Sequence, residues 1–254
     1  MSKNKAKIVI ATHKKYQMPD DELYLPLHVG AEGKSDLGYV KDNTGDNISL
    51  KNPYFCELTG LYWAWKNLDN EYIGLAHKKI NKKDLFHSVI TNDEINDYLE
   101  KTDVIVPKMR NYYIETLYSH YDHTMYVEPL NITGEIIKEK FPQYFDEFSR
   151  LKKRKKAHMF NMFVMKKEKL DEYCSWLFDI LFELEKRVDN SKYDSFHARF
   201  YGRVSELLLD VWLNTNNYSY KEIRVISMEK VDWLKKGTSF LKAKFTGKKY
   251  GKSF

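Results

Sequence analysis

The chain has 254 residues, of which 43% are hydrophobic and 31% are charged. A chain of this length and composition can bury the core of one large α/β domain or of two small domains. Aromatic residues are frequent at 15%, whereas Gly (11) and Pro (6) are scarce, which excludes disordered and collagen-like chains. The two cysteines, Cys56 and Cys174, exclude a disulfide framework and a four-cysteine zinc site.

The formal net charge of +6 is concentrated at one end of the chain. Residues 235–254 contain seven lysines and no acidic residue, so residues 1–234 together carry a charge of −1. Aromatic side chains alternate loosely with these lysines, a pattern that suits the anionic face of a membrane. A disordered, solubilising end is the alternative interpretation.

Two further patterns bear on where the protein works. No run of about 18 apolar residues is present, so no spanning helix is expected. The N-terminal apolar run is too short for a signal peptide. We therefore expect a cytoplasmic protein that is peripheral at the inner face of the membrane.

Short apolar runs alternate with amphipathic segments along the chain. The first run, over residues 7–11, is nearly continuous and predicts a strand buried on both faces, as in a largely parallel sheet. Residues 17–52 are mostly polar and contain several glycines, so we expect a long loop there. The elements expected after it are a helix over 53–68, a strand over 71–76, a helix over 92–101, a strand over 103–107, helices over 112–121, 132–140 and 142–150, a strand over 158–165, helices over 167–188 and 198–213, and a strand over 223–228.

This alternation of strands and helices predicts a single α/β domain, because no linker rich in Pro, Gly or Ser interrupts it. We expect the domain to cover residues 1–234, with a helical insertion at about 108–157. The basic aromatic tail covers 235–254.

The common nucleotide and nucleophile motifs are missing. The chain has no GxxxxGK[ST] loop, no GxGxxG after the first strand and no GxSxG turn. His120 and His123 are three residues apart, but without a companion motif they favour ordinary histidines over a metal site. The basic run 152–156 is typical of a solvated connection, with nucleic-acid or acidic-lipid binding as the alternative.

The most informative stretch covers residues 42–77, DNTGDNISLKNPYFCELTGLYWAWKNLDNEYIGLAH. Its loop gathers hydrogen-bonding side chains, and Glu57 then lies on a helix that is otherwise rich in aromatic residues. One interpretation is a hydrogen-bonded loop that caps a Trp-rich core helix. The other is a carbohydrate or nucleotide pocket, in which aromatic faces stack and acidic or amide groups bind hydroxyls.

The order of these motifs resembles a known family. The segments DNTGDNISLKN, CELTGLYWAWKN and YIGLAH, followed by HMFNMFVM, YCSWLF and the helix 199–213, are similar to the capsular and exopolysaccharide glycosyltransferases filed as domain of unknown function 4422. The resemblance covers residues 7 to about 228. It is specific because several separated motifs keep their order.

The resemblance implies an α/β fold of the GT-A-like type, with a Rossmann-type mixed sheet flanked by helices. It implies transfer of a sugar from a UDP-sugar donor to a lipid-linked oligosaccharide in polysaccharide biosynthesis. The family often accompanies enzymes that make UDP-galactofuranose, which points to galactofuranosyl transfer.

Site residues follow from combining this resemblance with the motifs. We expect the nucleotide near the end of the first strand, the donor sugar near the polar loop, and the departing UDP near the strand end at residue 77. A carboxylate base is expected at Glu57 or Glu206. The expected donor-binding residues are Ala11, Thr12, His13, Asp42, Asn43, Asp46, Asn47, Trp63, His77, Lys78, Lys79, His158 and Asn161.

The sequence departs from the family at one point. Family members read HYRRYF after the glycine-containing strand, whereas here His77 is followed by Lys78 and Lys79. Lysine keeps the positive charge but not the two-pronged geometry of arginine on a diphosphate. The chain also has no Asp-x-Asp motif, which favours a metal-independent reaction in which the lysines neutralise the leaving group; a divalent metal is the alternative.

Two functions from other classes remain as alternatives. One is a non-catalytic module that keeps the fold and binds a nucleotide sugar or glycan. The other is nucleic-acid binding through the basic segments, which the near-neutral body disfavours.

Overall fold

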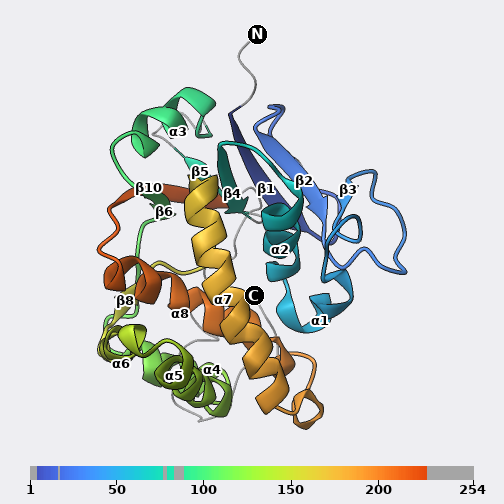
Figure 1. The fold of residues 1–254 in the computed structure, drawn as a ribbon. Coiled ribbons are helices and arrows are strands. Elements are labelled where there is room, and N and C mark those ends of the chain that lie inside the picture. Colours follow the sequence, from blue (N-terminus) through green and yellow to red (C-terminus); the bar gives the residue numbers. More distant parts are fainter. Residues whose placement is uncertain (1–4, 17, 77–78, 83–88, 228–254) are drawn as a thin grey trace.

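The computed structural model describes residues 5–16, 18–76, 79–82 and 89–227 (Figure 1). The basic tail over 235–254 lies outside the described residues, as do His77 and Lys78. Lys79 is described only as part of a strand, without its side chain.

Within the described residues, one mixed sheet forms the centre of the molecule, in the order β3-β2-β1-β4-β9-β6-β10-β5. β2, β1 and β4 are parallel, β9 runs antiparallel between β4 and β6, and β10 is parallel to β6. A two-stranded ribbon, β7 with β8, lies apart from it. The strands are β1 Ala6–Thr12, β2 Tyr24–His28, β3 Val40–Lys41, β4 Tyr72–Ala76, β5 Lys79–Lys82, β6 Val104–Pro107, β7 Arg110–Asn111, β8 Lys156–Ala157, β9 Phe163–Lys166 and β10 Tyr220–Ser227.

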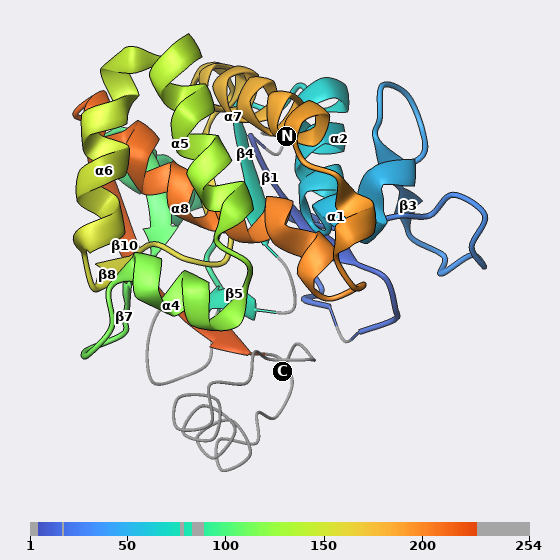
Figure 2. The same cartoon turned by 90° about the horizontal axis from the view of Figure 1, so that it is seen from below.

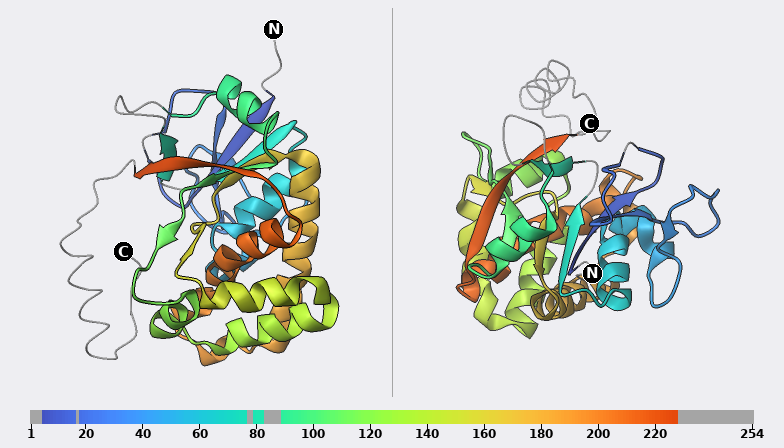
Figure 3. Two further views of the ribbon diagram at one scale, coloured as in Figure 1. Left: turned by 90° about the vertical axis from the view of Figure 1, so that its left-hand side faces the viewer. Right: turned by 90° about the horizontal axis from the view of Figure 1, so that it is seen from above.

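Helices flank the sheet and extend beyond one end of it (Figures 1 and 3). α5 packs on α7 and α6 packs on α8, as the view from below shows (Figure 2). The helices are α1 Asn52–Phe55, α2 Leu58–Asn67, α3 Asn92–Leu99, α4 Leu117–Thr124, α5 Glu128–Lys140, α6 Phe145–Lys153, α7 Lys167–Arg187 and α8 Phe200–Thr215.

The alternation of side chains in β1 explains why its sequence is a continuous apolar run. Ile8 and Ile10 pack into one core cluster together with α3, whereas Val9 and Ala11 pack into the larger cluster under α2, α7 and α8. Each face of the strand is therefore covered, as expected for an interior strand of an α/β sheet. The predicted mixed α/β sheet is confirmed.

The expected loop over 17–52 is wrong in part, because it contains β2 and β3. β2 has the sequence YLPLH, and a central proline argues against a strand because it lacks the N–H that a ladder needs. In the structure Pro26 lies beside Ile10 in the parallel pair.

Three other boundaries differ from the expected ones for local backbone reasons. The helix over 53–68 is two helices, separated at Cys56, whose φ is 53°. The strand over 158–165 begins only at Phe163, after two residues with positive φ. The helix over 112–121 begins only after Thr116, whose hydroxyl caps it by accepting from the Ser119 N–H at 3.1 Å.

The remaining expected elements are found at similar positions, including the long helix α7. Among the described residues, none of the helices combines the length and the apolar composition needed to cross a membrane.

Gly74 is required by the close approach of β4 to β9. A Cβ at this position would lie 2.8 Å from the carbonyl oxygen of Phe163 and 2.8 Å from Val164. Because a backbone atom cannot move aside, we expect Gly74→Ala to lower the free energy of unfolding by about 1–3 kcal/mol. Urea denaturation followed by circular dichroism measures this.

Gly202→Ala is the matched control. A Cβ at Gly202, within α8, would meet no atom closer than 3.7 Å, so alanine should stabilise the helix by about 0.5–1 kcal/mol. Equal stability of the two variants would contradict the strand-spacing argument.

Candidate active site

The carboxyl ends of several strands lie along one edge of the sheet. β1, β2, β4, β6 and β10 all point toward this edge, and the antiparallel β9 begins there. The segment before β9, which contains Asn161, is therefore brought beside the ends of β4 and β6. Open α/β sheets bind ligands at this edge.

A hydrogen-bond network joins two of the predicted residues at this edge. Asn161 donates from Nδ2 to Glu57 Oε1 at 2.7 Å and to the carbonyl oxygen of Gly202 at 3.1 Å. The Ser205 hydroxyl donates to Asn161 Oδ1 at 2.7 Å. The amide of Asn161, which lies just before β9, thus binds Glu57 at the start of α2 through its donor and binds α8 through both its donor and its acceptor.

The backbone is in unfavourable conformations on both sides of this network. Cys56, which precedes Glu57, has φ 53° and ψ −128°. Phe160 has φ 83° and Asn161 has φ 50°. Non-glycine residues adopt such conformations at a cost of about 1–3 kcal/mol each, and they gather at functional sites.

Glu206 extends the network from α8 as a second carboxylate. It is buried, and Arg203 Nη1 lies 3.4 Å from its Oε1. Burial raises the pKa of Glu206; the charge of Arg203 opposes this shift and that of Glu57 adds to it. The two predicted base candidates are therefore near neighbours whose charges interact.

Several cationic and aromatic side chains surround the carboxylates. Arg199 donates from Nε to the sulfur of Cys56 at 2.9 Å. The Arg110 guanidinium lies 4.9 Å from the ring centroid of Tyr112, and burial raises the pKa of Tyr112 to about 12. The combination of two carboxylates with arginines suits a reaction that moves a proton and releases an anion.

The sequence analysis did not single out Arg110, Tyr112, Arg199 or Arg203. Arg199 and Arg203 lie in the segment 199–213 that carried part of the resemblance, and their spacing from Glu206 by three and seven residues indicates a shared helix face. Nothing in the sequence places Arg110 beside them, because it comes from a separate strand.

Asp42 is fully buried at the centre of the predicted donor-sugar loop. Its carboxylate accepts from the backbone N–H of Gly30 and Ala31 at 2.8 and 3.0 Å. It also accepts from the hydroxyls of Ser49 and Thr59 at 2.5 and 2.8 Å. Asp42 therefore holds the loop to α2, and its contact with a donor sugar stays a prediction.

The other polar residues of this loop also make contacts within the protein. Asn43 donates to Glu32 at 2.9 Å, and Asp46 accepts from the Tyr62 hydroxyl at 3.2 Å. Asn47 donates to the carbonyl oxygen of Gly45 at 2.9 Å. These contacts agree with the hydrogen-bonded-loop interpretation.

Trp63 is buried and donates from Nε1 to the Thr44 hydroxyl at 3.0 Å, which ties α2 to the loop. At the end of β1, Ala11 and Thr12 are buried, and the Thr12 hydroxyl donates to the carbonyl oxygen of Lys14 at 2.7 Å. His13 follows them as an exposed residue at the same edge.

His158 lies in a different network from Asn161. Its Nδ1 is 2.5 Å from Asp210 Oδ1, its Nε2 is 3.2 Å from Glu222 Oε1, and its side chain has no solvent exposure. His158 thus links α8 to β10 from inside the protein, and its contact with a donor stays a prediction.

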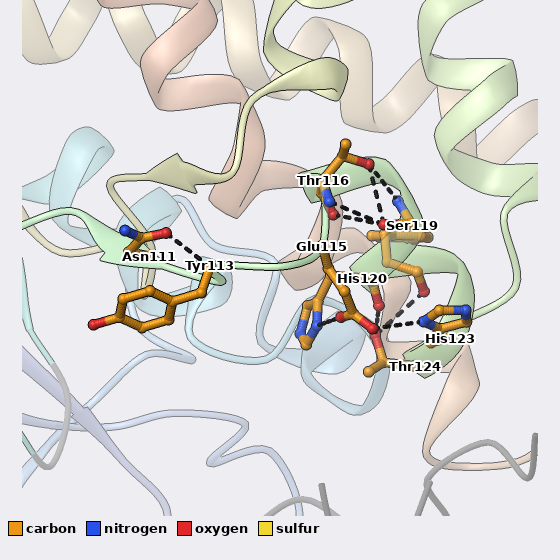
Figure 4. A network of polar contacts seen from close by, with 9 residues as sticks. Asn111, Tyr113, Glu115, Thr116, Ser119, His120, His123 and Thr124 are labelled. Atoms are coloured by element: carbon orange, nitrogen blue, oxygen red, sulfur yellow. Dashed lines mark hydrogen bonds and ion pairs between the residues drawn. The ribbon is translucent and has the colours of Figure 1, made fainter. Parts of the chain in front are cut away.

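Glu115 joins the two histidines that are three residues apart (Figure 4). Nδ1 of His120 and Nδ1 of His123 each lie 3.0 Å from one of its oxygens. Burial alone would raise the pKa of Glu115, but these two hydrogen bonds lower it. Burial lowers the pKa of His120, whose ring lies 4.0 Å from that of Tyr112.

The basic run 152–156 continues from α6 into β8. Lys152 lies 5.1 Å from the ring centroid of Phe148, and Arg154 Nη2 binds Glu147 at 2.6 Å. Lys155 and Lys156 are exposed. The first half of the basic run therefore packs against side chains of α6.

A mixed Rossmann-type sheet with a polar cluster at its carboxyl edge defines a protein of the α/β ligand-binding class. The match to a family model is more specific. The model of a domain of unknown function, DUF4422, matches residues 7–217, and the chain belongs to this family.

The structure is similar to that of the bifunctional glycosyltransferase WbbM in its apo form, with a TM-score of 0.79 and 27% sequence identity. The match covers 87% of this chain and 45% of the WbbM chain, so the chain spans about half the length of that protein. The GT-A-like fold predicted from the sequence is confirmed. No curated protein matches the chain.

The hydrogen bonds of Asp42 predict that its substitution strongly lowers the free energy of unfolding. In Asp42→Ala, two backbone amides and two hydroxyls lose their buried acceptor. We expect the free energy of unfolding to fall by about 3–5 kcal/mol. Asp46→Ala, at an exposed position of the same loop, should change it by about 0.5 kcal/mol. Urea denaturation measures both, and equal losses would contradict the bracing role.

The raised pKa of Glu206 predicts how stability depends on pH. The folded state binds the Glu206 proton more tightly than the unfolded chain, so this contribution is fully present below the unfolded pKa and is lost as pH rises through the folded pKa. The melting temperature of the neutral variant Glu206→Gln should therefore exceed that of the wild type increasingly as pH rises above the ordinary carboxyl pKa, and the difference should shrink toward about pH 4.

Glu135→Gln, at an exposed position of α5, is the control and should melt like the wild type throughout. A melting temperature of Glu206→Gln below that of the wild type at neutral pH would show that Glu206 stabilises the fold as a paired ion.

Proposed function

We propose that the chain is a glycosyltransferase that moves a sugar from a UDP-sugar to a lipid-linked oligosaccharide, and that galactofuranose is the sugar. The observation that carries the activity is the similarity over 87% of the chain to a bifunctional glycosyltransferase. The carboxylates and arginines at the sheet edge support it. The donor sugar and the acceptor rest on the family resemblance of the sequence motifs.

The proposed reaction is a direct displacement. The acceptor hydroxyl oxygen attacks the anomeric carbon, the bond from that carbon to the diphosphate breaks, and UDP leaves with the bonding electrons. The proton of the hydroxyl goes to the carboxylate of Glu206. Burial favours Glu206 over Glu57 for this role, because a base with a raised pKa accepts a proton more readily near neutral pH.

Glu57 is proposed to position Asn161 at the same site, through the hydrogen bond between their side chains. We propose that Arg203 and Arg110 stabilise the negative charge that develops on UDP, together with His77, Lys78 and Lys79.

The rest of the predicted site keeps its proposed roles. The end of β1 and the polar loop are proposed to bind the nucleotide and the donor sugar. The glycosyltransferase domain is proposed to cover 1–234, with α4, α5 and α6 as the helical insertion at about 108–157 and a membrane-binding tail over 235–254.

GT-A enzymes commonly hold a divalent metal with acidic side chains. Among the described residues, no group of three or more His, Cys, Asp or Glu side chains is arranged to hold a metal ion. We propose a metal-independent reaction, in which side chains neutralise the leaving group and no step passes through a metal.

The central experiment measures UDP release from candidate UDP-sugars with an extract of lipid-linked glycans. Glu206→Gln should lower turnover about 100-fold or more, because it removes the base and leaves the volume unchanged. Glu135→Gln is the matched control and should turn over like the wild type. Equal turnover of the folded Glu206→Gln variant would exclude Glu206 as the base, and the same assay on Glu57→Gln tests the other candidate.

Chelation gives a second readout in the same assay. We expect EDTA to leave UDP release unchanged, because cationic side chains neutralise the negative charge that develops on the leaving UDP. Loss of turnover with EDTA that is restored by added Mg²⁺ or Mn²⁺ would contradict this. UDP binding by calorimetry without any turnover would favour the alternative of a non-catalytic binding module.

A further inference from the structure

Two large hydrophobic side chains are exposed at a protruding part of the molecule. Tyr113 has 75% of its surface exposed and Ile114 has 65%. They follow β7 after one buried residue, Tyr112, and the β7–β8 ribbon lies at the periphery of the molecule beside α4 (Figure 2). In the close view, the side chain of Tyr113 points away from the Glu115 network (Figure 4).

The backbone holds these two side chains outward. Tyr113 has φ 57°, and its N–H donates to Asn111 Oδ1 at 2.8 Å. On either side, Tyr112 and Glu115 are buried, so the intervening pair is anchored at both ends. A tyrosine in a left-handed conformation is uncommon. The two side chains are therefore exposed by a fixed turn.

Basic residues surround the exposed pair. Lys155 and Lys156 are held next to it, because the carbonyl oxygen of Lys155 accepts from the Tyr112 N–H at 2.8 Å and Lys156 pairs with Asn111. Arg110 lies in β7, the other strand of the ribbon, and Lys108 lies two residues before it. All four basic residues are exposed.

We propose that this surface, Tyr113 and Ile114 with Lys108, Arg110, Lys155 and Lys156, docks onto an anionic lipid bilayer. Tyrosine and an aliphatic side chain insert at the level of the headgroups, and the four cations attract acidic phospholipids. The surface is separate from the C-terminal tail in sequence.

The surface lies near the proposed base, so docking there would help to bring the acceptor to the site. This role rests on the proposed glycosyltransferase function. Arg110 belongs both to this surface and to the cationic surroundings of Glu206, whose pKa it helps to lower against burial. Tyr113 is three residues further along the chain. Docking at this point would present the glycan of a lipid-linked acceptor next to the proposed base.

The experiment is co-sedimentation of the full chain with vesicles. One set contains phosphatidylcholine alone and the other contains added phosphatidylglycerol. The double variant Tyr113→Asn/Ile114→Ser should bind the anionic vesicles about tenfold more weakly than the wild type. Asparagine tolerates the left-handed conformation, so the turn is kept.

Leu50→Ser removes another exposed hydrophobic side chain, 78% exposed and outside this surface, and should bind like the wild type. Lys155→Glu/Lys156→Glu should weaken binding to anionic vesicles at least tenfold and leave binding to neutral vesicles unchanged. Undiminished binding by the Tyr113→Asn/Ile114→Ser variant, or a wild type that binds neither kind of vesicle, would overturn the proposal.

UDP binding by calorimetry separates this proposal from the proposed function. The Tyr113→Asn/Ile114→Ser variant should bind UDP as the wild type does, because neither residue belongs to the proposed donor site. If the wild type binds vesicles through this surface but does not bind UDP, docking stands and the glycosyltransferase proposal fails.

Discussion

The hydrogen bond from Asn161 to Glu57 is the interaction on which the geometry of the site depends. It joins two segments that are 104 residues apart. The Asn161 amide also binds α8, because its Nδ2 donates to the carbonyl oxygen of Gly202 and its Oδ1 accepts from the Ser205 hydroxyl. Both partners follow backbone breaks: Cys56 separates α1 from α2, and the turn at Phe160 delays the start of β9. Without these breaks α2 would be continuous with α1 and β9 would begin earlier, so the two side chains would not meet. The strain of the backbone and the contact are therefore parts of one arrangement.

Burial of Glu206 beside this contact has opposite consequences for folding and for chemistry. A carboxylate away from water and near Glu57 destabilises the folded state at neutral pH, and only Arg203 forms an ion pair with it among the described residues. The same environment raises its affinity for a proton, which is the property a general base needs. A surface position would avoid the cost and would lose the raised proton affinity. Asp42 shows the contrasting case, in which a buried carboxylate has four donors and holds a loop in place.

The sequence predicts those features that depend on local periodicity and misses those that depend on contacts across the fold. The apolar run of β1 and the amphipathic pattern of α7 predict their elements because burial on two faces or on one stripe leaves a clear period. β2 is missed because Pro26 breaks the strand signal, although its neighbours in the sheet accommodate it. Motif order predicted Glu57 and Asn161 as site residues, and the structure brings their side chains into contact, but no local pattern shows that Arg110 lies near Glu206. Such a neighbourhood is created only when β7 is placed beside α8.

The segment that carries Arg110 links the chemistry of the site with its surface. Tyr112 points inward and packs against His120, whereas Tyr113 points outward, and one left-handed residue produces this reversal. Glu115 then anchors the far side of the turn through His120 and His123. Both ends of the turn are therefore fixed by buried groups, Tyr112 before it and Glu115 after it, and Arg110 lies two residues before the first of them.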